Sequence, residues 1–272
     1  MKTREHFSEL YRKRTFFHYL FPFAGYAFYF MGIGAFLLLL AVLSVPVLLV
    51  PPLRKYLFGS FVNHFNFFLT RIYLPLLRVY KIAEDSTPAP GAFDKPVIYV
   101  ANHRSQLDGP IIMARLRNTG VIMKALYLRN PVFSILVKYS DFISVNSSSL
   151  DSLSVAMNRC KEVIAGGSNL LVFPEGSRSR SSRMLQFKDI AFRLSIEANV
   201  PVVPIIVHTD YPLMAKIPDS YYPPETIKLT VRALDAQYPK DGERASEFAN
   251  RVRKIMSDQV QDLDTDTYWE HL

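Results

Sequence analysis

A histidine and an aspartate, His103 and Asp108, stand five positions apart in the stretch "NHRSQLD". The apolar run "VIYVA" before them and the pattern "GPIIMARL" after them predict a strand that ends near His103 and a helix that begins near Asp108. A carboxylate at this spacing can fold back and accept a hydrogen bond from one imidazole nitrogen. The other nitrogen is then free to take a proton from a hydroxyl group that a substrate brings in. The pair therefore has the residue types of a general base and its orienting carboxylate.

The same two residues also have a purely structural interpretation. Asp108 suits the N-cap of the following helix, next to its positive end, with Pro110 in the first turn. His103 would then bind only backbone groups. The pair alone leaves both interpretations open.

A second polar motif, "VFPEGSRSR" over residues 172–180, includes the end of another apolar run, "NLLVF". Open α/β sheets bind ligands at the carboxyl ends of their strands, which is where this motif is predicted to lie. Gly176 permits a tight turn, and the guanidinium of Arg178 can bind a phosphate through two hydrogen bonds. A solvated basic loop is the alternative for this motif, and the later "NVPVVPI" can be wholly structural.

Short apolar runs alternate with helical patterns beyond residue 96, which predicts an α/β fold with a mostly parallel sheet covered by helices. Strands are predicted at 97–101, 121–126, 141–145, 169–173, 202–207 and 227–234, and helices at 109–116, 132–139, 150–164, 190–198 and 244–260. The acidic end "DLDTDTYWEHL" is interpreted as a solvated tail.

The N-terminal part of the chain has a different character. From Tyr19 to Leu53 there is no charged residue, and this stretch is longer than the roughly 20 residues that cross a bilayer core. We predict that residues 1–53 form a membrane anchor. Basic residues on both flanks do not orient a single span. Prolines at 46, 51 and 52 can break a helix, so a helical hairpin or a segment held in one leaflet stays open beside a full span.

Residues 54–82 keep the apolar richness but add basic side chains, with no acidic residue before Glu84. A helix would place His64, Arg71 and Arg78, which are seven positions apart, on nearly the same face. We predict an amphipathic helix at an anionic lipid surface, with a helix that covers the core of the next domain as the alternative. A Pro-rich connector follows, and the catalytic domain is assigned to residues 83–272.

The composition favours an anionic partner, because 32 Lys and Arg against 24 Asp and Glu give a net charge of +8. The basic residues flank the membrane-like segments, which favours a lipid bilayer over nucleic acid as that partner. A single cysteine, Cys160, excludes an internal disulfide. The sequence contains no G-x-S-x-G nucleophile turn, no G-x-x-x-x-G-K phosphate loop and no spacing typical of metal ligands.

Taken together and in this order, "NHRSQLD", "FPEGSRS" and "VPVVPI" resemble the glycerolipid acyltransferases of the 1-acylglycerol-3-phosphate (lysophosphatidic acid) acyltransferase family, whose mark is His, four residues, Asp. The resemblance covers residues 96–207 with specific motifs and extends more loosely to the apolar N-terminus. It implies transfer of a fatty acyl group from acyl-CoA or acyl carrier protein to the free hydroxyl of a lysophosphatidate-type acceptor, in glycerophospholipid synthesis, without a cofactor or metal. It also implies a membrane location, in a bacterial inner membrane with the catalytic domain on the cytoplasmic side.

Carried over by motif, the resemblance makes His103 the base and Asp108 its partner. The acceptor-binding motif of the family matches Glu175, Gly176, Ser177 and Arg178, with Ser177 in place of the usual threonine, and Lys124 is expected to assist.

One departure bears on the acceptor. Ser147 stands where the family has an arginine that is assigned to the acceptor phosphate, and serine cannot replace a bidentate guanidinium contact. Lys124, Arg178 or Arg180 are expected to compensate. The alternatives are an acyltransferase that acts on another lysophospholipid or an amino-acid lysolipid, or a non-catalytic lipid-binding protein at the membrane surface. A metal-dependent hydrolase with His103 and Asp108 as ligands is the weakest alternative, because no further ligands are apparent.

Overall fold

The computed structural model describes residues 50–89, 92–129, 140–146, 150–217, 220–221, 225–265 and 267–271, with a few single or paired positions elsewhere. Most of the predicted membrane segment, residues 19–53, lies outside these ranges, as do Ser147 and most of the predicted helix 132–139. Within the described ranges, none of the helices combines the length and the apolar character that crossing a bilayer requires.

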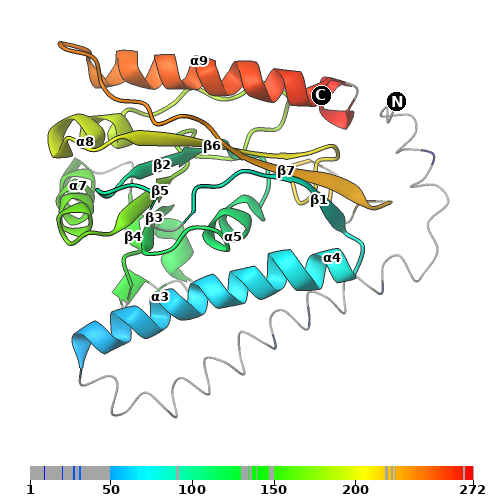
Figure 1. The fold of residues 1–272 in the computed structure, drawn as a ribbon, viewed down its shortest axis with the longest axis horizontal. Helices are drawn as coiled ribbons and strands as arrows, with labels where there is room; N and C mark the ends of the chain where they lie inside the picture. Colours follow the sequence, from blue (N-terminus) through cyan, green and yellow to red (C-terminus); the bar gives the residue numbers. More distant parts are fainter. Residues whose placement is uncertain are drawn as a thin grey trace.

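Seven strands in the described part of the chain form one sheet in the order β1-β7-β6-β2-β5-β3-β4 (Figure 1). Five neighbouring strands, β6 to β4 in this order, are mutually parallel, β7 runs antiparallel to β6, and β1 is parallel to β7. The predicted mostly parallel sheet is therefore confirmed. The strands are β1 (Tyr80–Asp85), β2 (Ile98–Ala101), β3 (Thr119–Lys124), β4 (Ile143–Val145), β5 (Asn169–Val172), β6 (Val202–Thr209) and β7 (Ile227–Ala233).

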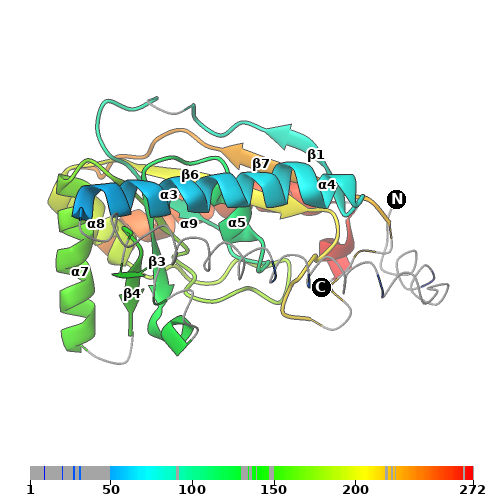
Figure 2. The same ribbon diagram turned by 90° about the horizontal axis from the view of Figure 1, so that it is seen from below.

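Helices cover both faces of the sheet, and Figures 1 and 2 show α3 and α9 on opposite sides of it. One apolar core joins the sheet to α3 and α5, and a second joins it to α7, α8 and α9. The helical elements are α3 (Pro51–Phe67), η1 (Phe68–Tyr73), α4 (Leu74–Leu76), α5 (Asp108–Met113), η2 (Ala125–Arg129), α7 (Leu150–Ala165), α8 (Ile190–Ala198), α9 (Ala245–Asp264) and η3 (Tyr268–His271).

The central strands are apolar along their whole length because both of their faces are covered. Every residue of β2 and of β6 is buried, as expected for parallel strands between two layers of helices. The helix α9 instead buries one stripe, Phe248, Val252, Met256 and Val260, at intervals of four residues. Its next member at the same interval is Asp264, which is also buried.

The single helix predicted over residues 54–82 is shorter in the structure. Helical residues end at Leu76, and Arg78 takes a left-handed conformation with φ of 55°. The chain then enters β1, which pairs with β7, and the hydroxyl of Tyr80 donates to the carbonyl of Thr70 at 2.5 Å. Since Arg78 lies beyond the helix and Arg71 forms an ion pair with Asp85, the predicted cationic face is not formed as expected.

The prediction of a solvated acidic tail is wrong. Asp264 is 4% exposed and Trp269 is 2% exposed, and the indole nitrogen of Trp269 donates to the carbonyl of Thr209 at 2.8 Å. The ring of Tyr268 packs edge-on against Tyr211, with 5.3 Å between the ring centroids. The residues after α9 therefore fold back onto the end of β6. This arrangement is favourable because it removes the apolar surface of their aromatic side chains from water.

Candidate active site

His103 and Asp108 are in direct contact. The His103 Nδ1 atom lies 2.9 Å from Asp108 Oδ2, with His103 in the loop after β2 and Asp108 at the first residue of α5. The Asp108 side chain is 3% exposed, whereas the imidazole keeps about a fifth of its surface, 20%, open to solvent. The imidazole also packs on Phe173, with 4.4 Å between the ring centroids. The imidazole is therefore accessible from solvent, whereas the carboxylate beside it is not.

Asp108 does not act as the predicted N-cap. The N-cap of α5 is Leu107, and no side chain caps this end of the helix. The Asp108 carboxylate instead points back along the chain, where Oδ2 accepts the backbone N–H groups of Arg104 and Ser105, each at 2.8 Å. These bonds wrap the loop around the carboxylate, so that it stays fixed in the position from which it orients His103.

Glu175 joins the second motif to the first. Its Oε1 accepts the backbone N–H of His103 at 2.8 Å, and its Oε2 accepts the N–H of Leu185 at 2.9 Å. Glu175 is 6% exposed, and burial raises the pKa of its carboxyl group more than the two backbone hydrogen bonds and the charges of His103 and Arg104 lower it. The backbone N–H of Ser179 also donates to the carbonyl of His103 at 2.8 Å. Both backbone groups of the candidate base are thus held by the loop after β5.

The other predicted acceptor-binding residues lie at or after the carboxyl ends of neighbouring strands. Gly176 has a positive φ of 65° and forms a turn by donating to the carbonyl of Phe173. Arg178 is half-buried and donates to the carbonyl of Met214 at 3.0 Å, and Ser177 beside it is also half-buried. Lys124 is exposed at the last position of β3. Because β2, β3 and β5 are parallel, their carboxyl ends share one edge of the sheet with His103.

Two connections of this site were missed by the sequence interpretation. The side-chain amide of Asn102 donates to the carbonyl of Val207 at 2.9 Å and accepts its N–H at 2.8 Å, which ties the end of β2 to β6. Arg104 pairs with Asp264, which is 160 positions later in the chain. The interval of four that puts Asp264 on the buried stripe of α9 was the available signal for this second contact.

Within the part of the chain that the structure describes, no cluster of three or more His, Cys, Asp or Glu side chains is arranged to hold a metal ion. An imidazole oriented by a buried carboxylate can activate a hydroxyl group, and the motif after β5 holds its backbone.

The chain is similar to known acyltransferases. Residues 78–208 match the family model described as Acyltransferase. A 1-acyl-sn-glycerol-3-phosphate acyltransferase of Chlamydomonas reinhardtii is 31% identical over 157 residues, which cover 58% of this chain and 46% of that protein. The alpha form of the enzyme from Ovis aries is 28% identical over 268 residues, which cover 90% of this chain and 83% of the relative.

The chain matches only about half the length of several curated relatives, with 46% of the Chlamydomonas protein and 48% of a chloroplastic protein from Arabidopsis thaliana covered. Among solved structures, the 1-acyl-sn-glycerophosphate acyltransferase of Thermotoga maritima has the same fold. The TM-score is 0.67 at 22% sequence identity, and the match covers 92% of this chain and 95% of that one.

Proposed function

We propose that this protein transfers a fatty acyl group from a thioester, acyl-CoA or acyl carrier protein, to the free hydroxyl of a lysophosphatidate-type acceptor. The observation that carries the proposal is the 2.9 Å contact between Asp108 and a partly exposed His103. The names of the curated relatives, which are 1-acyl-sn-glycerol-3-phosphate acyltransferases, support the same acceptor.

In this mechanism the acceptor hydroxyl gives its proton to Nε2 of His103 while its oxygen attacks the thioester carbonyl carbon. Asp108 stabilises the imidazolium that forms and keeps Nδ1 as the donor toward Oδ2. The tetrahedral intermediate collapses by breaking the carbon–sulfur bond, and the departing thiolate takes the proton from His103. The products are an ester on the acceptor and a free thiol on the donor, and the imidazole returns to its neutral state.

Arg178, Lys124 and the turn at Gly176 and Ser177 are proposed to bind the acceptor phosphate. Arg178 donates to a backbone carbonyl, and no described carboxylate forms an ion pair with it, so its charge is uncompensated by a described partner. A guanidinium contact to phosphate is charge-assisted and contributes about 1.5–3 kcal/mol. The contacts of Glu175 support a different role from the one the family motif implies, because both of its oxygens already accept backbone N–H groups.

The proposed reaction takes place at a lipid surface. Among the described residues of the helical segment from α3 to α4, the exposed large hydrophobic side chains include Phe67, Phe68, Ile72 and Leu76, the last of them by 76%. Together with the apolar stretch predicted at residues 19–53, they support attachment to a bilayer, where a lysolipid and a long acyl chain are both dissolved.

The test is the transfer of labelled oleoyl groups from oleoyl-CoA and from oleoyl acyl carrier protein by the full chain in detergent. Lysophosphatidate and lysophosphatidylglycerol serve as acceptors. We expect His103→Ala to lower kcat by about 10²- to 10⁴-fold. His64→Ala, which removes an exposed histidine of α3, is the matched control and keeps its activity.

Three outcomes would contradict the proposal in different ways. Unchanged turnover in folded His103→Ala removes His103 as the base. Strict preference for lysophosphatidylglycerol shows that the acceptor is this lysolipid and not lysophosphatidate. Absence of transfer to either lysolipid from either donor overturns the activity itself.

A further inference from the structure

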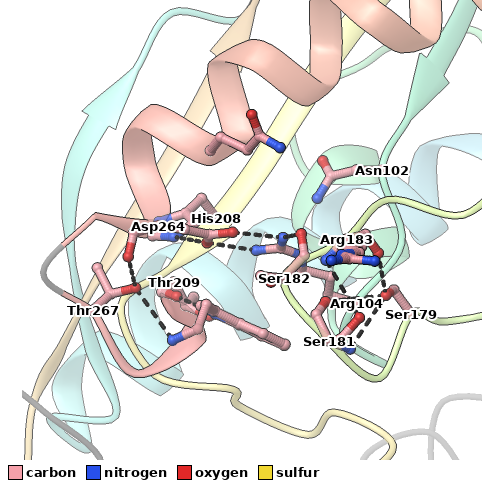
Figure 3. Close-up of polar contacts among 12 residues, drawn as sticks. Asn102, Arg104, Ser179, Ser181, Ser182, Arg183, His208, Thr209, Asp264 and Thr267 are labelled. Carbon is pink, nitrogen blue, oxygen red and sulfur yellow. Dashed lines mark hydrogen bonds and ion pairs between the residues drawn. The ribbon is translucent and has the colours of Figure 1, made fainter. Parts of the chain in front are cut away.

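Arg104 connects the proposed catalytic carboxylate to the segment at the end of α9. Its backbone N–H donates to Asp108 Oδ2 at 2.8 Å, so this residue is part of the loop that wraps around the carboxylate. Its side chain extends away from that loop to Asp264, where the guanidinium forms two parallel hydrogen bonds of 2.7 and 2.8 Å with the two carboxylate oxygens (Figure 3). The same guanidinium donates to the carbonyl of Ser182.

The far end of this connection is itself fixed. Asp264 Oδ1 lies 3.1 Å from His208 Nε2, and the side chains of Arg104, Asp264 and His208 are each only 5–6% exposed. Burial alone would raise the pKa of Asp264, but the hydrogen bonds from His208 and Arg104 outweigh it and lower that pKa. The carboxylate is therefore charged at neutral pH and pairs with Arg104 as an ion.

Trp269 closes the same region from the other side. The guanidinium carbon of Arg104 lies 4.5 Å from the centre of the indole ring, and Thr267 donates its hydroxyl to the carbonyl of Asp264 at 2.7 Å. A cavity of about 10 Å³, close to the space that one water molecule requires, is bordered by Arg104, Asp108 and Trp269. The segment after α9 therefore forms the back wall behind the carboxylate that orients the base.

A buried ion pair of this kind adds little to stability compared with apolar side chains of the same size, because both charges lose their hydration. The ion pair instead fixes the orientation of the Arg104 side chain, because the planar guanidinium can form two parallel hydrogen bonds with a carboxylate only in a narrow range of orientations. Glu175 and Ser179 hold the backbone of His103, and Arg104 is the next residue. A shift of the Arg104 side chain would move its N–H away from Asp108.

We propose that Asp264 is a positioning residue for the acyl transfer proposed above, and that it acts through Arg104 to hold the loop that carries His103 and Asp108. The inference rests on that proposed activity, and it assigns a role in the reaction to the segment at the end of α9, outside the three sequence motifs.

The experiment is a double-mutant cycle on the full chain in detergent, with kcat, KM and the thermal unfolding midpoint measured for each variant. The variants are Asp264→Asn, Arg104→Met and the double substitution, and Asp262→Asn on the exposed side of the same helix is the control. Arg104→Met keeps the contact between the Asp264 carboxylate and His208, and the double variant removes both charges of the pair formed by Arg104 and Asp264.

We expect Asp264→Asn to lower kcat by about 10- to 100-fold with KM for both substrates nearly unchanged. In the Arg104→Met background the same substitution should change kcat by less than about 3-fold, because the connection is already broken. Asp262→Asn should behave as the wild type.

Each other result overturns the inference without touching the proposed activity, provided that the wild type transfers acyl groups and His103→Ala does not. Wild-type kcat in folded Asp264→Asn removes the role of Asp264. If the loss of activity disappears when rates are corrected for the folded fraction, the pair formed by Arg104 and Asp264 contributes only to stability. An equal loss in the wild-type and Arg104→Met backgrounds shows that Asp264 does not act through Arg104.

Discussion

The carboxylate of Glu175 accepts the backbone N–H of His103 at 2.8 Å, across 72 positions of sequence. The loop after β5 therefore fixes the backbone of the candidate base from both sides, because Ser179 donates to the carbonyl of the same residue. Glu175 is buried, and its second carboxylate oxygen accepts the backbone N–H of Leu185. The two sequence motifs thus form one structural unit in which the second motif holds the first.

Replacing Glu175 with glutamine should disturb this unit. Glutamine has only one side-chain acceptor, so its amide group would face one of the two backbone N–H groups that the carboxylate now binds. We expect kcat to fall by about 10- to 100-fold. We also expect the free energy of unfolding to fall by about 1–3 kcal/mol. Steady-state rates and thermal unfolding of Glu175→Gln should be compared with Glu162→Gln, which changes an exposed surface ion pair. Wild-type kcat in the folded variant would contradict this role.

Arg178 should control the binding of the acceptor rather than the rate of the chemical step. Loss of a charge-assisted contact to phosphate in Arg178→Gln is expected to raise KM for lysophosphatidate by about 10- to 100-fold, with a smaller change in kcat. Arg183→Gln, which alters an exposed basic side chain further along the same loop, is the control. If KM for lysophosphatidate is the same in both variants, Arg178 does not bind the phosphate.

Gly120 in β3 has no room for a side chain. A Cβ atom at this position would lie 2.2 Å from the carbonyl oxygen of Asp141, which precedes the neighbouring strand β4. Gly120→Ala must therefore move backbone, and we expect a loss of about 1–3 kcal/mol in the free energy of unfolding. The control is Gly59→Ala in α3, where a Cβ would meet nothing within 4 Å and alanine favours the helix. Equal unfolding midpoints for the two variants would refute the close approach.

The pair formed by Glu243 and Arg251 should make stability depend on acid pH. Two hydrogen bonds of 2.8 Å from Arg251 hold the pKa of Glu243 at about 2, below its usual value of 4.5. Because the folded state disfavours the protonated carboxyl, the contribution is present above pH 4.5 and is lost as the pH falls from there toward 2. Glu243→Gln should cost about 0.5–1 kcal/mol at neutral pH. Its deficit in unfolding midpoint should narrow between about pH 5 and pH 3, and a constant deficit would argue against the ion pair.

The sequence was sufficient for the central part of this architecture, and the reason is physical. Strands such as β2 and β6 are continuously apolar because both faces are covered, and the contact between His103 and Asp108 is local in the chain. The edge strand β1 was missed because three of its six residues, Lys81, Glu84 and Asp85, are charged, and because it follows a helical segment that is rich in apolar residues. An edge strand of that kind is defined by its partner, β7, rather than by its own pattern.

The burial of Asp264 was not predicted for a related reason. An aspartate in an acidic stretch is expected in water, and its burial depends on Arg104 and His208, which are 160 and 56 positions away. The pattern of polar residues in an amphipathic helix does not indicate which of them pairs with a cation that is distant in the sequence. The interval of four from Phe248 to Val260 indicates that Asp264 faces inward, but the sequence interpretation ended the helix at Val260 and assigned the acidic residues after it to a solvated tail.

The side chain of Asn102 occupies the place of a neighbouring strand against Val207. We therefore expect the amide hydrogen of Val207 to be protected from exchange with solvent deuterium by a side chain that stands next to His103, whereas β6 otherwise pairs with backbone groups of β2 and β7. Opening of the loop would release the Val207 hydrogen before the sheet itself separates. The exchange rate of this hydrogen thus reports how often the loop at the proposed active site opens. The measurement requires no probe attached to the site.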